Sequence, residues 1–469
     1  MNTKIRTAGI VAAVVVLGYP IASWVIGLAV ERQLQRAEQQ SLEQVPYITV
    51  ISRNYRGGIF SATDDVTFAV GGPFAQAAKA APGRSFLSDF RLTTHNIIHH
   101  GPLPGFRTVA FATVDSQLVL PSEVKARLDA LLNGRPVLSV HSRMHWFGGS
   151  TSQLTSPAFQ TEVAPGITLV SQGITGTAEL SGNGDGTVDF IAKGFSASSQ
   201  KGGAELGEIR LTGATHRAFV TLNIGKTHLT IDQSDVHAPA PAPPIALRHL
   251  ELNSDTSATG DHVDTQGSLS IASLQAGKFA ATQLGYSVAA THLYGPALAA
   301  LTADLRQAGR SMGTPAGSAR TPASEQPWVS AFQKDGIEIL LHDPVVEISR
   351  IGFLTPDGEL RLSAKFTAPG LKREDFAKPG PAAMVAIVPH LQAAADLRVD
   401  VALLEKLLED NANRERFLAQ EEAFERQGYI VRDGKALTAH VEFAAGKLSI
   451  NGKPFSPGQP GPSGPPAPR

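Results

Sequence analysis

Residues 138–146 read Leu-Ser-Val-His-Ser-Arg-Met-His-Trp, and this alternation decides the fold class of the chain. In an extended strand successive side chains point to opposite faces. One face then carries Leu138, Val140, Ser142, Met144 and Trp146, and the other carries Ser139, His141, Arg143 and His145. A strictly alternating stretch of this kind predicts a strand that is buried on one side only.

The same period of two recurs between Pro46 and Thr291. The stretches that show it are Ile59–Val70, Phe86–Ile98, Thr108–Leu120, Ile167–Leu180, Thr187–Ala192, Glu208–Ile231, Ile245–Leu252 and Ser268–Leu274. Pairs such as Gly148-Gly149 and Asp185-Gly186 separate many of them and tolerate the backbone angles of two-residue hairpins. The strands follow one another too closely for crossover helices. We therefore predict a mainly β fold with some α, built on a large antiparallel sheet.

Apolar stripes at helical spacing predict a few helices as well. Those in the β-rich part are Ser122–Leu132 and Pro296–Ala308, and those near the C-terminus are Ala382–Asp396 and Val401–Asp410. The predicted order is an antiparallel β-rich region over 46–293, a helix over 294–311, a flexible linker over 312–327, a smaller α+β segment over 328–455 and a disordered Pro/Gly-rich tail over 456–469.

Residues 8–30 contain no charged side chain. As a helix they would cover about 34 Å, which suffices for the ~30 Å hydrocarbon core of a bilayer. Lys4 and Arg6 precede them, so the positive-inside rule predicts a cytoplasmic tail over 1–7. We predict a transmembrane anchor over 8–30 and a polar juxtamembrane helix over 31–45. A cleaved signal peptide is the alternative, because Gly27-Leu28-Ala29 is a tolerable cleavage pattern.

Composition narrows the function classes. The chain has 469 residues, no cysteine and a formal net charge of −1. The absence of cysteine excludes disulfides, thiolate metal sites and cysteine nucleophiles. No basic patch indicates a nucleic-acid partner. The 45 glycines and 31 prolines suit many short strands joined by tight turns.

Histidines on two predicted strands invite a metal site. His95 and His99 share one strand face but lie about 13 Å apart, and His100 points the other way. His141 and His145 are similarly too far apart on a strand to act as a zinc pair. We interpret both sets as imidazoles on solvated strand faces.

Two acidic clusters are equally weak as sites. Asn183-Gly184-Asp185-Gly186 resembles part of a calcium loop but lacks the closing Glu, so a hairpin turn is the better interpretation. Asp255, Asp261, His262 and Asp264 fall in a Ser/Thr/Gly-rich stretch that we expect to be an exposed connection. No nucleophile elbow, phosphate loop or dinucleotide fingerprint is present.

We therefore predict no catalytic, cofactor-binding or metal-binding residues, and no enzyme activity. An unrecognised hydrolase is the last-ranked alternative, with His99, His100 and Asp261 as the residues to test.

The best-formed local motif is Tyr55-Arg56-Gly57-Gly58-Ile59-Phe60-Ser61. Its two glycines allow a tight bend or bulge, with the two aromatic rings packed around it. A contact surface close to the membrane is the alternative interpretation, since the motif follows the anchor by only some 25 residues.

Several short stretches, in order along the chain, resemble the YdgA-like family of bacterial proteins. They are the N-terminal anchor, Tyr55–Ser61, His99–Leu103, Gly428–Ile430, Asp433-Gly434, Gly446–Leu448 and Asn451–Phe455. The resemblance implies an inner-membrane protein of Gram-negative bacteria with a β-rich periplasmic part and no accepted catalytic residues. The anchored, extended-β plan is also similar to that of AsmA-like proteins, which are implicated in lipid transport.

Two functions follow as hypotheses. A sheet with one apolar face must cover it, and the predicted helices are few, so the first is an envelope protein that binds lipid or another apolar ligand in a trough of the sheet. The alternative is a structural or assembly factor that acts at the inner membrane by self-association or by binding partners.

Overall fold

The computed structural model describes thirteen stretches of the chain. They are residues 19–20, 22–35, 48–70, 91–120, 122–164, 166–200, 202–219, 222–237, 239, 242–312, 330–376, 386–408 and 414–455. The chain divides into two compact units. The first comprises Met1–Gly203, Gly207–Asn223 and Leu301–Ala331, and the second comprises Ala204–Leu206, Ile224–Ala300 and Phe332–Arg469.

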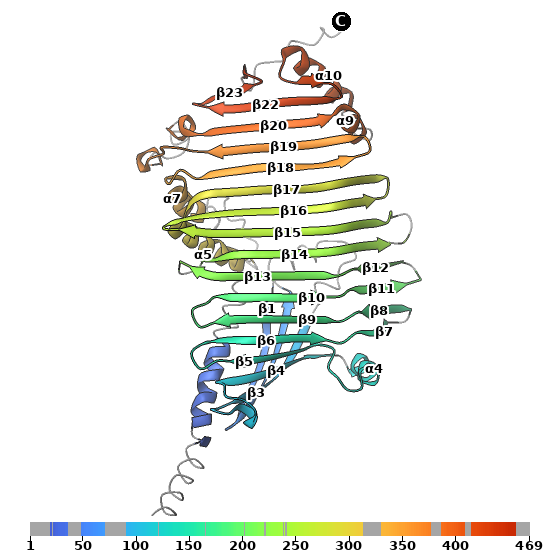
Figure 1. Cartoon of the computed structure of the whole chain (residues 1–469), viewed down its shortest axis with the longest axis vertical. Helices are drawn as coiled ribbons and strands as arrows, with labels where there is room; N and C mark the ends of the chain where they lie inside the picture. Colours follow the sequence, from blue (N-terminus) through green and yellow to red (C-terminus); the bar gives the residue numbers. More distant parts are fainter. Residues whose placement is uncertain are drawn as a thin grey trace, which may run out of the picture. The chain divides into compact units, whose positions relative to one another are not determined.

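The first unit is an antiparallel meander. Its strands are β1 (Ile48–Gly57), β2 (Ser61–Val70), β3 (Arg91–His100), β4 (Ala112–Val119), β5 (Ser139–Met144), β6 (Gly149–Ser156), β7 (Phe159–Ala164), β8 (Ile167–Ser171), β9 (Ile174–Ser181), β10 (Gly186–Ala192), β11 (Phe195–Ser199) and β13 (Ile209–Ala218). The main ladder runs β1-β2-β3-β4-β5-β6-β9-β10-β13 (Figure 1). A shorter ladder places β8 between β7 and β11. Strands β1 to β6 pair in chain order and confirm the predicted meander there, whereas β6 pairs with β9 and β10 with β13, which are not consecutive.

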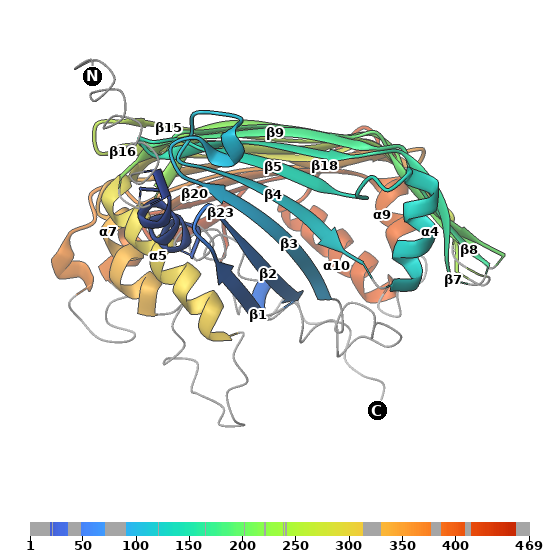
Figure 2. The same cartoon turned by 90° about the horizontal axis from the view of Figure 1, so that it is seen from below.

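Helices occupy few positions in this unit. Helix α4 (Ser122–Leu132) has the predicted bounds, and a short 3₁₀ turn, η1 (Pro104–Phe106), lies between β3 and β4. Residues 22–35 form a further helix. Figure 2 shows this helix and α4 on opposite sides of strands β3 and β4. Strand β12 (Gly202–Leu206) and helix α5 (Gly295–Met312) are divided between the two units.

The helix over residues 22–35 packs against the sheet of the first unit. Ser23, Gly27 and Val30, which repeat at helical spacing, are its buried positions. Val30 is fully buried in a core cluster with Ile98 and Met144. Part of the predicted anchor therefore covers strands instead of standing apart from them. Among the residues that the structure describes, no helix is both long enough and apolar enough to cross a bilayer. Residues 8–18 and 21 of the predicted span lie outside that set.

The second unit is also antiparallel. Its strands are β14 (Leu222–His237), β15 (Ile245–Thr259), β16 (His262–Ala276), β17 (Phe279–Tyr294), β18 (Val345–Thr355), β19 (Gly358–Thr367), β20 (Gln392–Asp400), β21 (Val431–Asp433), β22 (Ala436–Ala444), β23 (Lys447–Ile450) and β24 (Lys453–Phe455). Each strand from β14 to β20 pairs with the next, and β22 then pairs with β20, β21 and β23. Its helical segments are η3 (Phe332–Gly336), α7 (Ile337–Leu340), η4 (Arg373–Phe376), η5 (Val388–His390), α9 (Val401–Leu407) and α10 (Arg414–Gln427).

The structure differs from the sequence predictions in two places, on either side of the predicted linker and in one predicted helix. Strand β17 pairs directly with β18, so strands before and after the predicted linker belong to one sheet. The helix predicted over Ala382–Asp396 is wrong at its C-terminal end, because residues from Gln392 onward form strand β20. Three consecutive alanines favour a helix by propensity, but pairing with β19 on one side and β22 on the other overrides it.

Candidate ligand cavity

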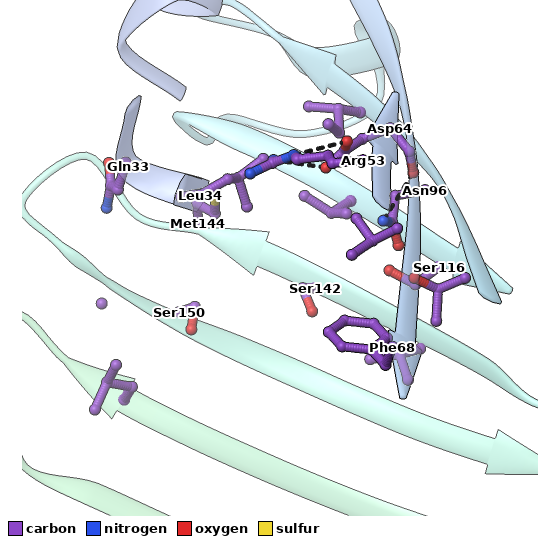
Figure 3. Close-up of a pocket in the computed structure, with 17 residues that line it drawn as sticks. Gln33, Leu34, Arg53, Asp64, Phe68, Asn96, Ser116, Ser142, Met144 and Ser150 are labelled. Atoms are coloured by element: carbon purple, nitrogen blue, oxygen red, sulfur yellow. Dashed lines mark hydrogen bonds and ion pairs between the residues drawn. The ribbon is translucent and has the colours of Figure 1, made fainter. Parts of the chain in front are cut away.

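A cavity of about 430 Å³ lies in the first unit, between the helix over residues 22–35 and the sheet (Figure 3). Alternate residues of each strand face it, such as Asp64, Val66 and Phe68 on β2. Strands β3, β4 and β5 contribute in the same way, so the cavity runs across several strands. The predicted alternation is confirmed over β5 (Ser139–Met144), because Val140, Ser142 and Met144 line the cavity and the intervening His141 and Arg143 are exposed. It does not extend to Trp146, which lies in the turn after β5 and is 43% exposed.

The lining combines a large apolar part with separate polar groups. The apolar side chains are Leu34, Val66, Phe68, Ile98, Val114, Val140, Met144 and Leu180. The polar side chains are Gln33, Arg53, Asp64, Thr94, Asn96, Ser116, Ser142 and Ser150. Ligand pockets commonly have this composition and a volume of roughly 300–1,000 Å³.

One ion pair is fixed within the cavity wall. Arg53 donates from Nε to Asp64 Oδ1 at 2.9 Å and from Nη2 to Oδ2 at 2.6 Å. The Asp64 side chain is only 5% exposed and that of Arg53 is 19% exposed. Asn96 donates to the backbone carbonyl of Asp64 at 2.9 Å, which joins β3 to the same group. The two parallel bonds fix the guanidinium plane, and such a fork is a specific recognition element for anionic groups.

The helix contacts the sheet at His100. This side chain is 1% exposed, and its Nδ1 lies 2.9 Å from the carbonyl oxygen of Ser23, while Ser23 Oγ donates to the His100 carbonyl at 2.8 Å. A Cβ at Gly27 would lie 2.6 Å from His100 Cε1, so only glycine permits this approach. Burial lowers the pKa of His100, and this effect is larger than the rise that its hydrogen bonds with the backbone cause. The residue is thus held as a neutral ring inside the helix–sheet contact.

A smaller cavity of about 290 Å³ adjoins this contact. It lies between the helix and the β1–β2 turn, and its lining includes Trp24, Tyr55, Ile59 and His100. Burial raises the pKa of Tyr55, and the nearby carboxylates of Glu31 and Asp64 raise it further. The motif Tyr55–Ser61 is the tight turn that the sequence predicts, closed by a 2.8 Å bond from the Gly58 amide to the Ser61 carbonyl.

The histidines considered as metal ligands lie apart. His95 pairs with Asp65 at 2.6 Å. The prediction of a solvated imidazole is wrong for His100, which is 1% exposed because the helix over residues 22–35 covers it. His141 pairs with Asp115 at 2.6 Å, and His145 contacts Thr151. Among the described residues no group of three or more potential ligands is arranged to hold a metal ion.

The structure confirms the prediction for one acidic cluster and contradicts it for the other. Asn183–Gly186 forms the predicted hairpin turn between β9 and β10. The stretch around Asp255 and Asp264 is not a loop, because both residues lie within the long strands β15 and β16. Ser and Thr side chains pair across this hairpin, as in the 2.8 Å contact between Thr256 and Thr265, and so a polar sequence still makes a regular ladder.

His262 belongs to a small ring stack in the second unit instead of a carboxylate site. Its imidazole stacks on that of His292 at 4.1 Å, and the ring of His342 stacks on Tyr294 at 3.9 Å. Asp264 accepts a bond from the His292 amide at 2.7 Å, so its carboxylate has a structural role here.

Sequence reasoning missed the Arg53–Asp64 pair. One signal was available, since Asp64 is in phase with Val66 and Phe68 on the buried face of a predicted strand. A carboxylate in such a position requires a partner. The partner comes from β1, a strand that the alternation pattern did not single out.

Comparison with known proteins now gives the family. A family model described as a bacterial protein of unknown function (DUF945) matches residues 1–458. The chain belongs to this family. The match confirms the bacterial family of unknown function that the YdgA-like resemblance implied, while the YdgA-like assignment and the similarity to AsmA-like proteins stay predictions. No curated protein and no solved structure matches this DUF945 member.

Proposed function

We propose that this DUF945 member is a non-enzymatic protein of the bacterial inner membrane that binds a lipid in the 430 Å³ cavity of its first unit. Its N-terminal tail is cytoplasmic and the remainder lies in the periplasm. The uncharged residues 8–18, which stand behind Lys4 and Arg6 and before the packed helix, support the anchor and its orientation.

The observation that carries the ligand class is the cavity lining. Apolar side chains of β2 to β5 offer a surface for an acyl chain, and Arg53 and Asp64 offer a fixed polar group at one place in the wall. A ligand with an apolar body and one polar end matches this distribution better than a wholly polar metabolite does.

Two neighbouring substitutions test the cavity. Ser142→Trp fills it from β5, whereas Arg143→Trp puts the same ring on the opposite, exposed face of that strand. Native mass spectrometry of the full chain should detect bound lipid in the wild type and in Arg143→Trp, and much less in Ser142→Trp. Lipids that merely surround the anchor would be equal in both variants. Equal lipid content, or none in the wild type, would overturn the ligand assignment.

The orientation of the protein in the membrane can be tested separately. A reporter enzyme that is active only outside the cytosol should be active when it is fused after Phe455. Activity restricted to a cytosolic reporter would contradict the periplasmic location.

A further inference from the structure

Three turns at one end of the first unit expose apolar side chains. We call residues 57–60, 101–111 and 145–148 the apolar rim; they join β1 to β2, β3 to β4 and β5 to β6. In an antiparallel meander these three connections lie at the same end of the strands. Phe106 is 73% exposed, Val109 72% and Phe147 98%. Ile59, Phe60 and Trp146 are also exposed.

Two of the three rim turns contact Tyr19, which lies just before the helix over residues 22–35. The ring of Tyr19 stacks on Phe60 at 5.8 Å and on Phe106 at 5.4 Å, and its hydroxyl donates to the Leu103 carbonyl at 2.8 Å. Farther along the helix, Trp24, Val25 and Leu28 face outward and are about half exposed. The helix therefore adds exposed apolar side chains to those of the rim.

The absence of carboxylates distinguishes the rim from the adjacent turn between β9 and β10. Its sequence contains one arginine, Arg107, and no aspartate or glutamate. The adjacent turn, Gly182–Asp185, reads Gly-Asn-Gly-Asp and is polar. Aromatic side chains accompanied by a basic residue and no carboxylate suit the headgroup region of an anionic bilayer.

The length of the uncharged sequence adds an independent constraint. Residues 7–18, twelve in number, separate Arg6 from Tyr19. As a helix they would cover roughly 18 Å, against a hydrocarbon core of ~30 Å. The helix after Tyr19 cannot cover the rest of the bilayer thickness while it stays packed on the sheet, because Ser23, Gly27 and Val30 are buried there. Embedding the rim by about 5–10 Å, with slight bilayer thinning, would close the gap.

We infer that the apolar rim enters the outer interface of the lipid bilayer and seats the first unit directly on the membrane. This inference rests on the membrane anchor proposed above. It also places the end of the cavity that is lined by Met144, Gly149 and Ser150, which flank the rim turn 145–148, close to the lipid surface.

The lack of cysteine permits a direct test, since single cysteines can be introduced for labelling. Val109→Cys and Phe147→Cys report from the rim. Leu131→Cys is the control, an exposed apolar side chain (54%) on α4, which follows the opposite end of β4. Each full-length variant would carry an environment-sensitive fluorophore and be reconstituted in vesicles of phosphatidylcholine and phosphatidylglycerol at a 3:1 ratio.

Labels at positions 109 and 147 should shift to the blue and be quenched by brominated lipids, and the label at 131 should do neither. If the protein floats with the vesicles but all three labels behave as in water, the rim inference is overturned and the anchor stands. If the protein does not float with the vesicles, the anchor fails and the inference fails with it.

Discussion

The ion pair in the cavity wall allows a quantitative prediction. Asp64→Asn keeps the side-chain volume but leaves the Arg53 guanidinium without its carboxylate. Removing one partner of a buried pair costs about 3–5 kcal/mol. Because Arg53 is 19% exposed and keeps some contact with water, we expect the lower end of this range, about 3 kcal/mol.

A second pair in the same unit provides the control. Lys125 and Asp129 on α4 approach to 2.7 Å, nearly the same separation, but their side chains are 62% and 43% exposed. A helical pair of this kind contributes only about 0.3–0.5 kcal/mol. Asp129→Asn should therefore have almost no effect on stability. The two pairs have similar separations, so the comparison separates the effect of burial from that of distance.

Hydrogen–deuterium exchange in the full chain measures each variant where its pair lies, at the β1 and β2 amides for Asp64→Asn and at the α4 amides for Asp129→Asn. A loss of about 3 kcal/mol corresponds to exchange that is roughly 100-fold faster. The double variant Arg53→Met/Asp64→Leu should recover most of the protection, because replacing a buried pair by apolar residues is often neutral. Equal exchange rates in Asp64→Asn and Asp129→Asn would refute the reasoning.

Three further predictions concern pH and backbone fit. Burial lowers the pKa of His100, so below about pH 6.5 the unfolded chain binds a proton that the folded chain does not, and the unfolding free energy of the first unit falls. His100→Gln should flatten this fall in melting curves; an unchanged pH profile would contradict it. Burial alone would raise the pKa of Asp400, but its contacts with Lys435 and the Glu359 amide outweigh burial and lower it. Stability from Asp400 is thus present above about pH 4 and lost in acid, and Asp400→Asn should weaken that acid dependence in urea titrations. Gly358→Ala would overlap Asp400 at a φ of 142° and should cost about 3 kcal/mol or more, whereas Gly434→Ala, in open space at a φ of 60°, should cost about 1–2 kcal/mol. Similar melting temperatures for the two alanine variants would count against the clash.

Local pattern predicted much of the secondary structure. The period of two in residues 138–146 gave the correct inward and outward faces of β5, and helix α4 has the predicted bounds. Both depend on neighbours within a few positions of the sequence, so the pattern of apolar residues carries the information. The polar hairpin of β15 and β16 and the alanine-rich β20 were misread, because pairing with distant strands determines those segments.

The sequence by itself determined that the chain is mainly β, antiparallel and free of disulfides, and that an uncharged stretch stands near its start. Only the tertiary structure decided that Arg53 pairs with Asp64, that the helix over residues 22–35 packs on His100, and that three separate turns form one apolar rim. The physical reason is sequence separation. Side-chain alternation fixes which face a residue occupies, but which residues of different strands meet on that face depends on strand order and register, and these are set by the packing of the whole sheet.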